Sequence, residues 1–406
     1  MFAITGITGN VGGNVARNLL AAGRPVRAVM RDVRKGDGWA ERGCELATAD
    51  ILDVSALASA FEGTEGVFVL VPPNFDPAPS FPEARATAAA LKSAIERARP
   101  DRVVYLSTIG AQAGEPNLLT QHTIIEQVLG ELSMPIVFLR PGWFMENSRW
   151  DVAAARENGV IPGFLQPLDK PVPMVAIADV GRVAAEVLQG IWNGRRVVEL
   201  EGPRRVTPDE VAATFAELLG RPVRMDTVPR ETWEPLFRSQ GMKNPTPRIR
   251  MLDGFNEGWI EFENGEASSR KGEVALKTVL QMLIEREDKR PHVEGDCLAG
   301  AVTRLRQTRV VSALIALASC VEREPSSRQY GLGATDFNRR PNRESLRRVT
   351  IAPLNGGLPD MPQANSRLPQ RRKPLVLKSS PPGQLPRRQK STEGHSYLAR
   401  PRSIRD

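Results

Sequence analysis

Three side chains with acid–base and hydrogen-bonding chemistry follow one another in the first third of the chain. Ser107 comes directly after the apolar run Val103–Leu106, and His122 and Glu126 lie in the amphipathic segment that follows. Because His122 and Glu126 are four residues apart, they share one face of a helix. An imidazole with an ordinary pKa of about 6.5 can hold a proton at neutral pH, especially beside a carboxylate, so His122 is a candidate proton donor. The alternative is a hydrogen-bonded core histidine, with Glu126 at the surface or paired within the helix.

A glycine-punctuated turn at the N-terminus has a second kind of chemistry. The apolar run Phe2–Ile4 predicts a buried strand, and apolar residues at three- and four-residue steps predict a helix over 11–22. Three glycines between them suit a dinucleotide pyrophosphate, because they allow a tight turn, close approach of the backbone and close packing of the helix on the strand. The amides of that helix would face the phosphates. The predicted cofactor turn consists of Gly6, Thr8, Gly9, Asn10, Val11 and Gly12.

Further cofactor contacts are predicted where later strands end. The second predicted strand ends at Arg31 and Asp32, the position that meets the adenine ribose. Arginine there favours the 2′-phosphate of NADP and a carboxylate favours the free hydroxyl of NAD, and because Arg31 comes first we predict NADP(H) over NAD(H). Arg34 and Lys35 are interpreted as solvated loop residues. After the third predicted strand, Asp50 is expected at the adenine edge. At the end of the fourth, Val71 and Pro72 are expected beside the nicotinamide.

Strand-like and helix-like segments alternate well beyond the first turn. This alternation predicts an α/β fold with a doubly wound parallel sheet of the Rossmann type, and uncharged apolar runs such as 67–71 are typical of strands covered on both faces. We predict an NAD(P)-binding core over 1–150. Residues 151–285 are predicted to complete the domain with a smaller C-terminal substrate lobe, which an amphipathic helix over 271–285 closes.

Four motifs together resemble the NmrA-like family of atypical short-chain dehydrogenase/reductase proteins. They are Gly6–Gly12, Leu106–Ala111, His122 with Glu126, and Leu139–Asn147. The resemblance covers roughly residues 1–285. The family includes NADPH-dependent quinone reductases and redox-sensing regulators.

The resemblance also implies roles for particular residues. Leu139–Asn147 corresponds to the segment that lines the nicotinamide and substrate side of the cleft, which places Phe144 and Asn147 in the substrate pocket. In short-chain reductases a serine at the position of Ser107 orients the substrate carbonyl, and a Tyr-x-x-x-Lys pair on the next helix supplies the proton. This chain has no such pair and carries His122 on that helix instead.

Two functions follow from these residues. The first is an oxidoreductase that transfers hydride from NADPH to a quinone-like or other small carbonyl acceptor, with His122 and Ser107 as catalytic residues and the cofactor carrying the redox chemistry. The second is a non-catalytic NADP(H)-binding redox sensor, which the missing Tyr-x-x-x-Lys keeps open. A nucleotide-sugar epimerase is disfavoured, since epimerisation relies on that tyrosine.

The basic character of the chain lies in its last third. The net charge is +8, yet residues 286–406 contain 24 Lys and Arg against 11 Asp and Glu, which leaves a net charge of −5 on residues 1–285. One more helix is predicted within 286–322, over 298–320. Residues 323–406 are rich in Pro and Arg with few large apolar side chains, so we predict disorder. This tail either binds nucleic acid nonspecifically or has no function; we favour no function.

Cysteine usage and hydropathy restrict the remaining classes. The three cysteines Cys44, Cys297 and Cys320 are widely spaced, which predicts neither a disulfide framework nor a metal site. No apolar run approaches the roughly 20 residues of a membrane-spanning helix, and no leader pattern is present at the N-terminus. We expect a cytoplasmic protein with a small-molecule electron acceptor as its partner; the oligomeric state stays open.

Overall fold

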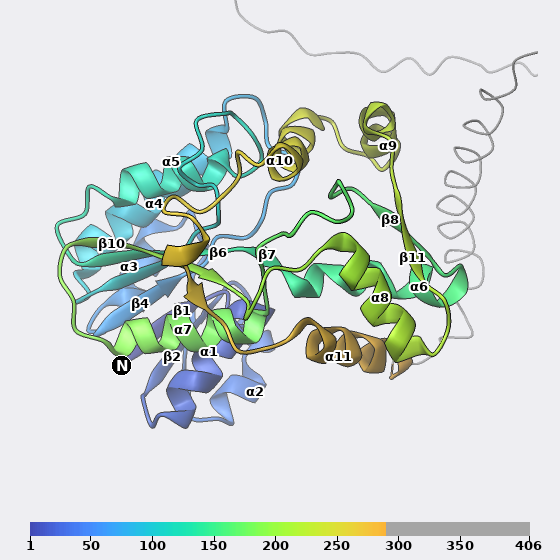
Figure 1. Cartoon of the computed structure of the whole chain (residues 1–406). Helices are drawn as coiled ribbons and strands as arrows, with labels where there is room; N and C mark the ends of the chain where they lie inside the picture. The colour runs from blue at the N-terminus through green and yellow to red at the C-terminus, as the bar shows by residue number, and fades with distance from the viewer. Residues whose placement is uncertain (290–406) are drawn as a thin grey trace, which may run out of the picture. The chain divides into compact units, whose positions relative to one another are not determined.

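The computed structural model describes residues 1–289, and a parallel sheet lies at its centre (Figure 1). The strands of this sheet are β1 (Phe2–Thr5), β2 (Val26–Met30), β3 (Glu45–Thr48), β4 (Gly66–Val69), β5 (Val103–Leu106), β6 (Ile136–Pro141), β10 (Arg195–Glu201) and β12 (Arg270–Lys271). Their order is β12-β10-β6-β5-β4-β1-β2-β3, and each neighbouring pair is parallel. The predicted doubly wound parallel sheet is confirmed.

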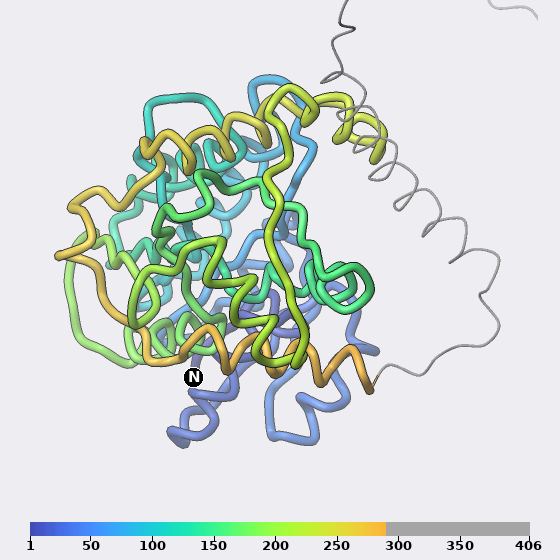
Figure 2. The backbone as a smooth tube through the Cα atoms, turned by 45° about the vertical axis from the view of Figure 1, so that its right-hand side comes forward, coloured from blue at the N-terminus to red at the C-terminus, as the bar shows by residue number. Residues whose placement is uncertain are grey.

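Helices cover both faces of the sheet (Figures 1 and 2). On one face lie α1 (Asn10–Ala21) and α7 (Ile177–Gln189), which pack against each other. On the other face lie α3 (Val54–Phe61), α4 (Pro82–Ala98) and α5 (Thr120–Leu129). This double cover explains why the strands contain long apolar runs, since side chains on both faces are removed from water.

The two-residue period of the strands assigns each side chain to one of the two cores. In β1, Phe2 and Ile4 join the core under α1 and α7, and Ala3 joins the core under α3, α4 and α5. In β5, Leu106 belongs to the first core and Tyr105 to the second. Tyr105 therefore faces α5, the helix that contains His122.

The rest of the described chain forms a smaller lobe, which lies to the right of the sheet in Figure 1. Its elements are β7 (Trp143–Phe144), η2 (Met145–Trp150), α6 (Val152–Glu157), β8 (Val160–Gly163), β9 (Met174–Val175), α8 (Pro208–Leu219), β11 (Arg224–Thr227), η3 (Arg230–Thr232), α9 (Trp233–Ser239), α10 (Thr246–Glu257), η4 (Glu266–Ser268) and α11 (Leu276–Asp288). Two short pieces, η1 (Val33–Lys35) and α2 (Asp37–Ala40), follow β2. Within the smaller lobe, the side chains pack into two apolar clusters, which are separate from the two cores of the sheet.

The helix predicted over 271–285 begins later than expected. Lys271 belongs to β12, which pairs with β10, and α11 starts only at Leu276. The intervening backbone is held by Asp179, whose Oδ2 accepts hydrogen bonds of 2.9 Å from the amides of Glu273 and Val274. Sequence periodicity correctly predicted the apolar face of this helix. It cannot predict that Arg270 and Lys271 pair with a strand about 70 residues earlier in the chain.

The predicted segments 1–150 and 151–285 both contribute to the sheet. Strands β10 and β12 and helix α7 come from the second segment. Among residues 1–289, no helix is both long enough and apolar enough to cross a membrane. The predictions of a helix over 298–320 and of disorder over 323–406 fall outside the described residues.

Candidate cofactor and active site

The glycine turn between β1 and α1 has the geometry of a backbone cradle. Gly6 has a φ of +63°, a conformation that L side chains rarely adopt. A Cβ atom at Gly12 would lie 2.5 Å from the carbonyl oxygen of Gly6, so only glycine permits this approach of the helix to the turn. Thr8 and Asn10 are exposed at the rim. The side chain of Val11 is buried in the core, which leaves only its main chain for a ligand.

The first turn of α1 is open to an anion. The N-cap residue is Gly9, which supplies no side-chain hydrogen bond, and the first turn contains no acidic residue. Its amides and the positive end of the helix dipole therefore have no competing partner from a capping side chain. These residues fit the pyrophosphate of a dinucleotide.

The carboxyl ends of β1 and β4 meet beside this turn. The Thr5 hydroxyl oxygen accepts a hydrogen bond of 2.7 Å from the Leu70 amide, and the hydroxyl lies 3.3 Å from the Leu70 carbonyl oxygen. Between these two strands the sheet order reverses, which is where doubly wound folds bind their ligands. Val71, half-buried, and Pro72, exposed, follow at once on the loop after β4.

At the end of β2, Arg31 is exposed and the neighbouring Asp32 is paired with Arg34. The Asp32 carboxylate accepts hydrogen bonds from Arg34 Nε at 2.9 Å and from Arg34 Nη2 at 3.1 Å, and the Arg34 guanidinium lowers the pKa of Asp32. Arg34 is solvent-exposed, as predicted, yet its pairing with Asp32 was missed. Asp50 is exposed, and its Oδ1 accepts the amide of Leu52 at 3.0 Å.

Tyr105 of β5 and Ser107, directly after β5, each form a hydrogen bond with a residue of α5. The hydroxyl of Tyr105 lies 2.7 Å from Nδ1 of His122, and the hydroxyl of Ser107 donates to Oε1 of Glu126 at 2.5 Å. The pairs match because a two-residue step along a strand and a four-residue step along a helix are similar in length. The Ser107 proton is therefore directed to Glu126, on the α5 side of the sheet.

His122 differs from the expectation of an ordinary pKa. Burial lowers its pKa to about 4, and burial also raises the pKa of Tyr105. Both groups are neutral at pH 7. Among the described residues, His122 is the hydrogen-bond partner of the buried Tyr105 hydroxyl. The hydroxyl proton is satisfied there only when it is donated to Nδ1, and this arrangement places the ring proton on Nε2.

Glu126 is buried, and its hydrogen-bond partners are Ser107 and Arg140 rather than His122. It is 8% exposed, and Arg140 of β6 binds it with two parallel hydrogen bonds, Nε to Oε1 at 2.9 Å and Nη2 to Oε2 at 2.6 Å. Arg140 also reaches Glu263 at 2.8 Å. This role of Arg140 is not among the sequence predictions; its signal in the sequence is a lone charge in the buried run 136–141, which requires an acidic partner.

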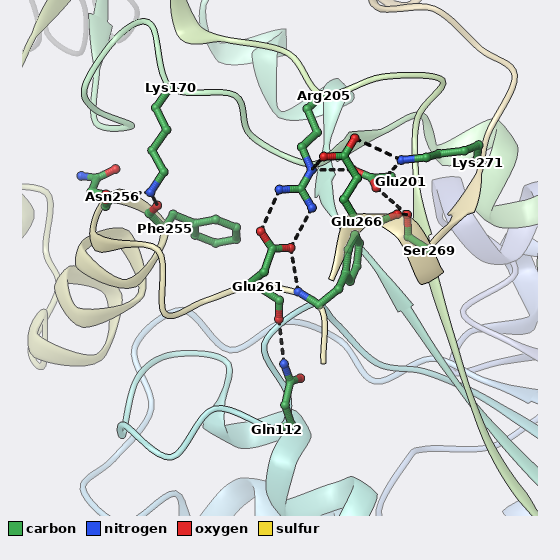
Figure 3. A network of polar contacts seen from close by, with 11 residues as sticks. Gln112, Lys170, Glu201, Arg205, Phe255, Asn256, Glu261, Glu266, Ser269 and Lys271 are labelled. Carbon is green, nitrogen blue, oxygen red and sulfur yellow. Dashed lines mark hydrogen bonds and ion pairs between the residues drawn. The ribbon is translucent and has the colours of Figure 1, made fainter. Parts of the chain in front are cut away.

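A second polar network ties the lobe to the sheet edge (Figure 3). Arg205 binds both carboxylate oxygens of Glu261 at 2.7 and 2.8 Å, and Gln112, on the loop after β5, donates to the Glu261 carbonyl at 2.7 Å. Glu201, fully buried on β10, accepts from Lys271 Nζ at 2.6 Å. The segment between α10 and β12 is thereby held against the loop that leads from Ser107 toward α5.

The predicted pocket residues lie where the chain leaves β6 for the lobe. Phe144, half-buried, belongs to β7, and Asn147, exposed, belongs to η2. Trp143 packs edge-to-face on Phe255 at 5.3 Å between ring centroids, which joins this segment to α10. The structure thus places the glycine turn, the loop after β4, the first turn of α5 and this segment at the same edge of the sheet.

Comparison with known proteins gives a consistent result. The sequence profile of the NmrA-like family matches residues 1–261. The chain is 29% identical over 259 residues to NAD(P)H azoreductase of Xenophilus azovorans, covering 63% of this chain and 85% of that relative. It is 27% identical over 244 residues to quinone oxidoreductase 2 of Escherichia coli (strain K12), covering 60% and 82%.

A solved structure shows the same fold. The crystal structure of the NADPH-dependent quinone oxidoreductase of Escherichia coli complexed with NADPH aligns with a TM-score of 0.59 and 24% identity, covering 70% of this chain and 99% of that one. The profile match includes all four motifs on which the resemblance was based. The chain therefore belongs to the NmrA-like family.

Proposed function

We propose that this protein is an NADPH-dependent oxidoreductase that reduces a quinone-like or other small conjugated carbonyl acceptor. The observation that supports it most is the uncapped glycine turn at the point where the order of the parallel sheet reverses. The similarity to an azoreductase and a quinone oxidoreductase supports the same class of reaction. A bound NADPH supplies the hydride.

The chain's own residues bind, orient and donate hydrogen bonds. The glycine turn holds the pyrophosphate, and Val71 and Pro72 border the nicotinamide. His122, in the first turn of α5, offers its Nε2–H to the acceptor oxygen on which negative charge develops. The hydrogen bond from Ser107 to Glu126 fixes the start of the loop after β5. The contact of Ser107 with the substrate carbonyl stays a prediction. Phe144 and Asn147 border the acceptor.

The proposed preference for NADPH has a local electrostatic reason. The carboxylate of Asp32 would repel a 2′-phosphate, but Arg34 already neutralises it with two hydrogen bonds. Arg31 is exposed beside this pair and has no acidic partner among the described residues. The end of β2 therefore presents a net positive charge to the ribose.

The test is turnover by the full-length chain. NADPH and NADH oxidation is followed with and without a panel of small quinones. Acceptor-dependent oxidation of NADPH, at least tenfold faster than that of NADH, supports the proposal. Tight NADPH binding with no turnover on any acceptor would instead favour the redox sensor.

Replacing Arg31 with alanine is expected to raise the Kd for NADPH about tenfold or more and to change the Kd for NADH little, because one charge-assisted phosphate contact is lost. Titration of protein fluorescence with each cofactor measures both constants. Lys35→Ala, which removes another exposed cation of the same loop, is the control and should have a small effect. An equal loss of affinity for both cofactors in Arg31→Ala would contradict the assignment.

The contribution of His122 to kcat/KM is expected to be independent of pH between about 5.5 and 8, since a ring with a pKa of about 4 stays neutral over this range. Tyr105→Phe keeps an aromatic ring against His122 but no longer selects the Nε2–H tautomer of the imidazole, so kcat should fall several-fold with KM little changed. NMR of the imidazole nitrogens reports the tautomer directly. A break in kcat/KM near pH 6.5 that disappears in His122→Asn would show that the ring titrates as an ordinary histidine.

A further inference from the structure

Arg248 stands apart from the other arginines of the described chain. It lies in the first turn of α10, and its partly shielded side chain has no hydrogen bond or ion pair to another described residue. Every other arginine among residues 1–289 that is shielded to this degree binds a carboxylate or a main-chain carbonyl. These arginines are Arg24, Arg27, Arg102, Arg140, Arg156, Arg182, Arg205 and Arg250.

The guanidinium of Arg248 is held in place by an aromatic ring. Its Cζ lies 4.3 Å from the centroid of Phe237, which is fully buried. This cation–π contact fixes one face of the group and uses none of its N–H donors. Burial lowers the pKa of Arg248, and within residues 1–289 no acidic residue offsets that cost. Arg248 is half-buried, so part of its side chain is exposed to solvent.

Hydrogen bonds place this part of α10 at the carboxyl edge of the sheet. The carbonyl of Pro247, next to Arg248, accepts from the amide of Leu118 at 2.8 Å, just before α5. The connection from α9 to α10 is bound to the loop after β4, where the Asp76 carboxylate accepts from the amides of Lys243 at 2.9 Å and Asn244 at 2.6 Å. Arg248 therefore lies between the two loops that border the proposed acceptor site.

An aromatic cluster extends from Arg248 toward Trp143 of β7. Phe237 lies 5.6 Å from Phe164 between ring centroids, and Phe164 and Trp143 both pack against the buried cluster that contains Phe237. Trp143 precedes Phe144 in β7, so the two side chains lie on opposite sides of this strand, with Phe144 against the core under α1 and α7. An acceptor that contacts the half-buried rings of Trp143 and Phe164 would bring a substituent at its edge toward Arg248.

We propose that Arg248 binds an anionic group on the acceptor, so that this protein reduces planar conjugated acceptors carrying a carboxylate, sulfonate or phosphate. The inference rests on the proposed reductase function for the reaction, but the anion site itself does not require turnover. A carboxylate, sulfonate or phosphate presents oxygens at the spacing of the guanidinium fork and supplies the charge that the lobe lacks at this position.

The kinetic test compares 1,4-naphthoquinone with 1,4-naphthoquinone-2-sulfonate as acceptors for the full-length chain. Arg248→Gln is expected to raise KM for the sulfonate about tenfold and to leave KM for the neutral quinone within about twofold. Arg250→Gln is the matched control, because it removes the same charge from the same helix but from an arginine that already pairs with Glu115 at 3.3 Å. It should behave like the wild type. Equal changes for both acceptors in Arg248→Gln would overturn the proposal.

The binding test separates this site from the reductase function. Naphthalene-2-sulfonate and uncharged 2-naphthamide are titrated calorimetrically into the protein at saturating NADP⁺. We expect tighter binding of the sulfonate, a tenfold loss in Arg248→Gln, partial recovery in Arg248→Lys and no loss in Arg250→Gln. If Arg248→Gln loses sulfonate binding although the wild type reduces no quinone, the anion site is retained and the reductase function is rejected. No preference of the wild type for the sulfonate would reject the anion site. An unchanged melting temperature of Arg248→Gln confirms that the lobe is folded.

Discussion

Gly12→Ala is expected to raise the Kd for NADPH at least about a hundredfold while the chain still folds. The new methyl group would lie 2.5 Å from the Gly6 carbonyl oxygen and 2.9 Å from the Ile7 amide nitrogen. Both are backbone atoms of the cradle, so the turn must move away from α1. Overpacking of this kind costs about 1–3 kcal/mol of stability, which a domain of this size tolerates, whereas a displaced turn no longer matches the pyrophosphate.

Fluorescence titration with NADPH, together with thermal unfolding, measures the two effects separately. Gly38→Ala is the matched control, since nothing lies within 4 Å of a Cβ at that position and Gly38 does not require a positive φ. It should bind NADPH like the wild type. If Gly12→Ala retained wild-type affinity, the glycine turn would not be the pyrophosphate site.

The second large effect concerns the buried ion pair between β6 and α5. Arg140→Met removes the cation that holds Glu126 and lies 3.8 Å from Glu199, both of them buried carboxylates. Breaking a buried pair in this way costs about 3–5 kcal/mol, because the remaining charge is desolvated without a partner. We therefore expect a clear decrease in the free energy of unfolding, measured by urea denaturation of the full chain.

Two comparisons test that explanation. Lys277→Met removes one partner of the exposed pair with Glu217, and its cost should stay below about 1 kcal/mol. The double variant Arg140→Met with Glu126→Leu should recover part of the lost stability, since it removes one of the stranded carboxylates. A single Arg140→Met variant as stable as the wild type would show that this network contributes little.

Local features of the chain were sufficient for much of the fold and for the cofactor turn. The predicted strand Phe2–Ile4 and helix 11–22 correspond to β1 over Phe2–Thr5 and α1 over Asn10–Ala21. Periodicity and glycine placement act over a few residues, so they can be interpreted without knowing what packs on them. The same holds for Gly12, because the position of this residue in the turn already indicates that no side chain fits there.

Tertiary structure alone decided the chemistry around α5. The sequence located His122 and Glu126 on one helix face but could not show that Tyr105 fixes the first and Arg140 binds the second. The low pKa of His122 results from desolvation, which depends on every segment packed around the ring. The unpaired state of Arg248 likewise depends on which carboxylates the fold brings near it. Sequence patterns describe neighbours along the chain, whereas burial and charge pairing depend on neighbours in space.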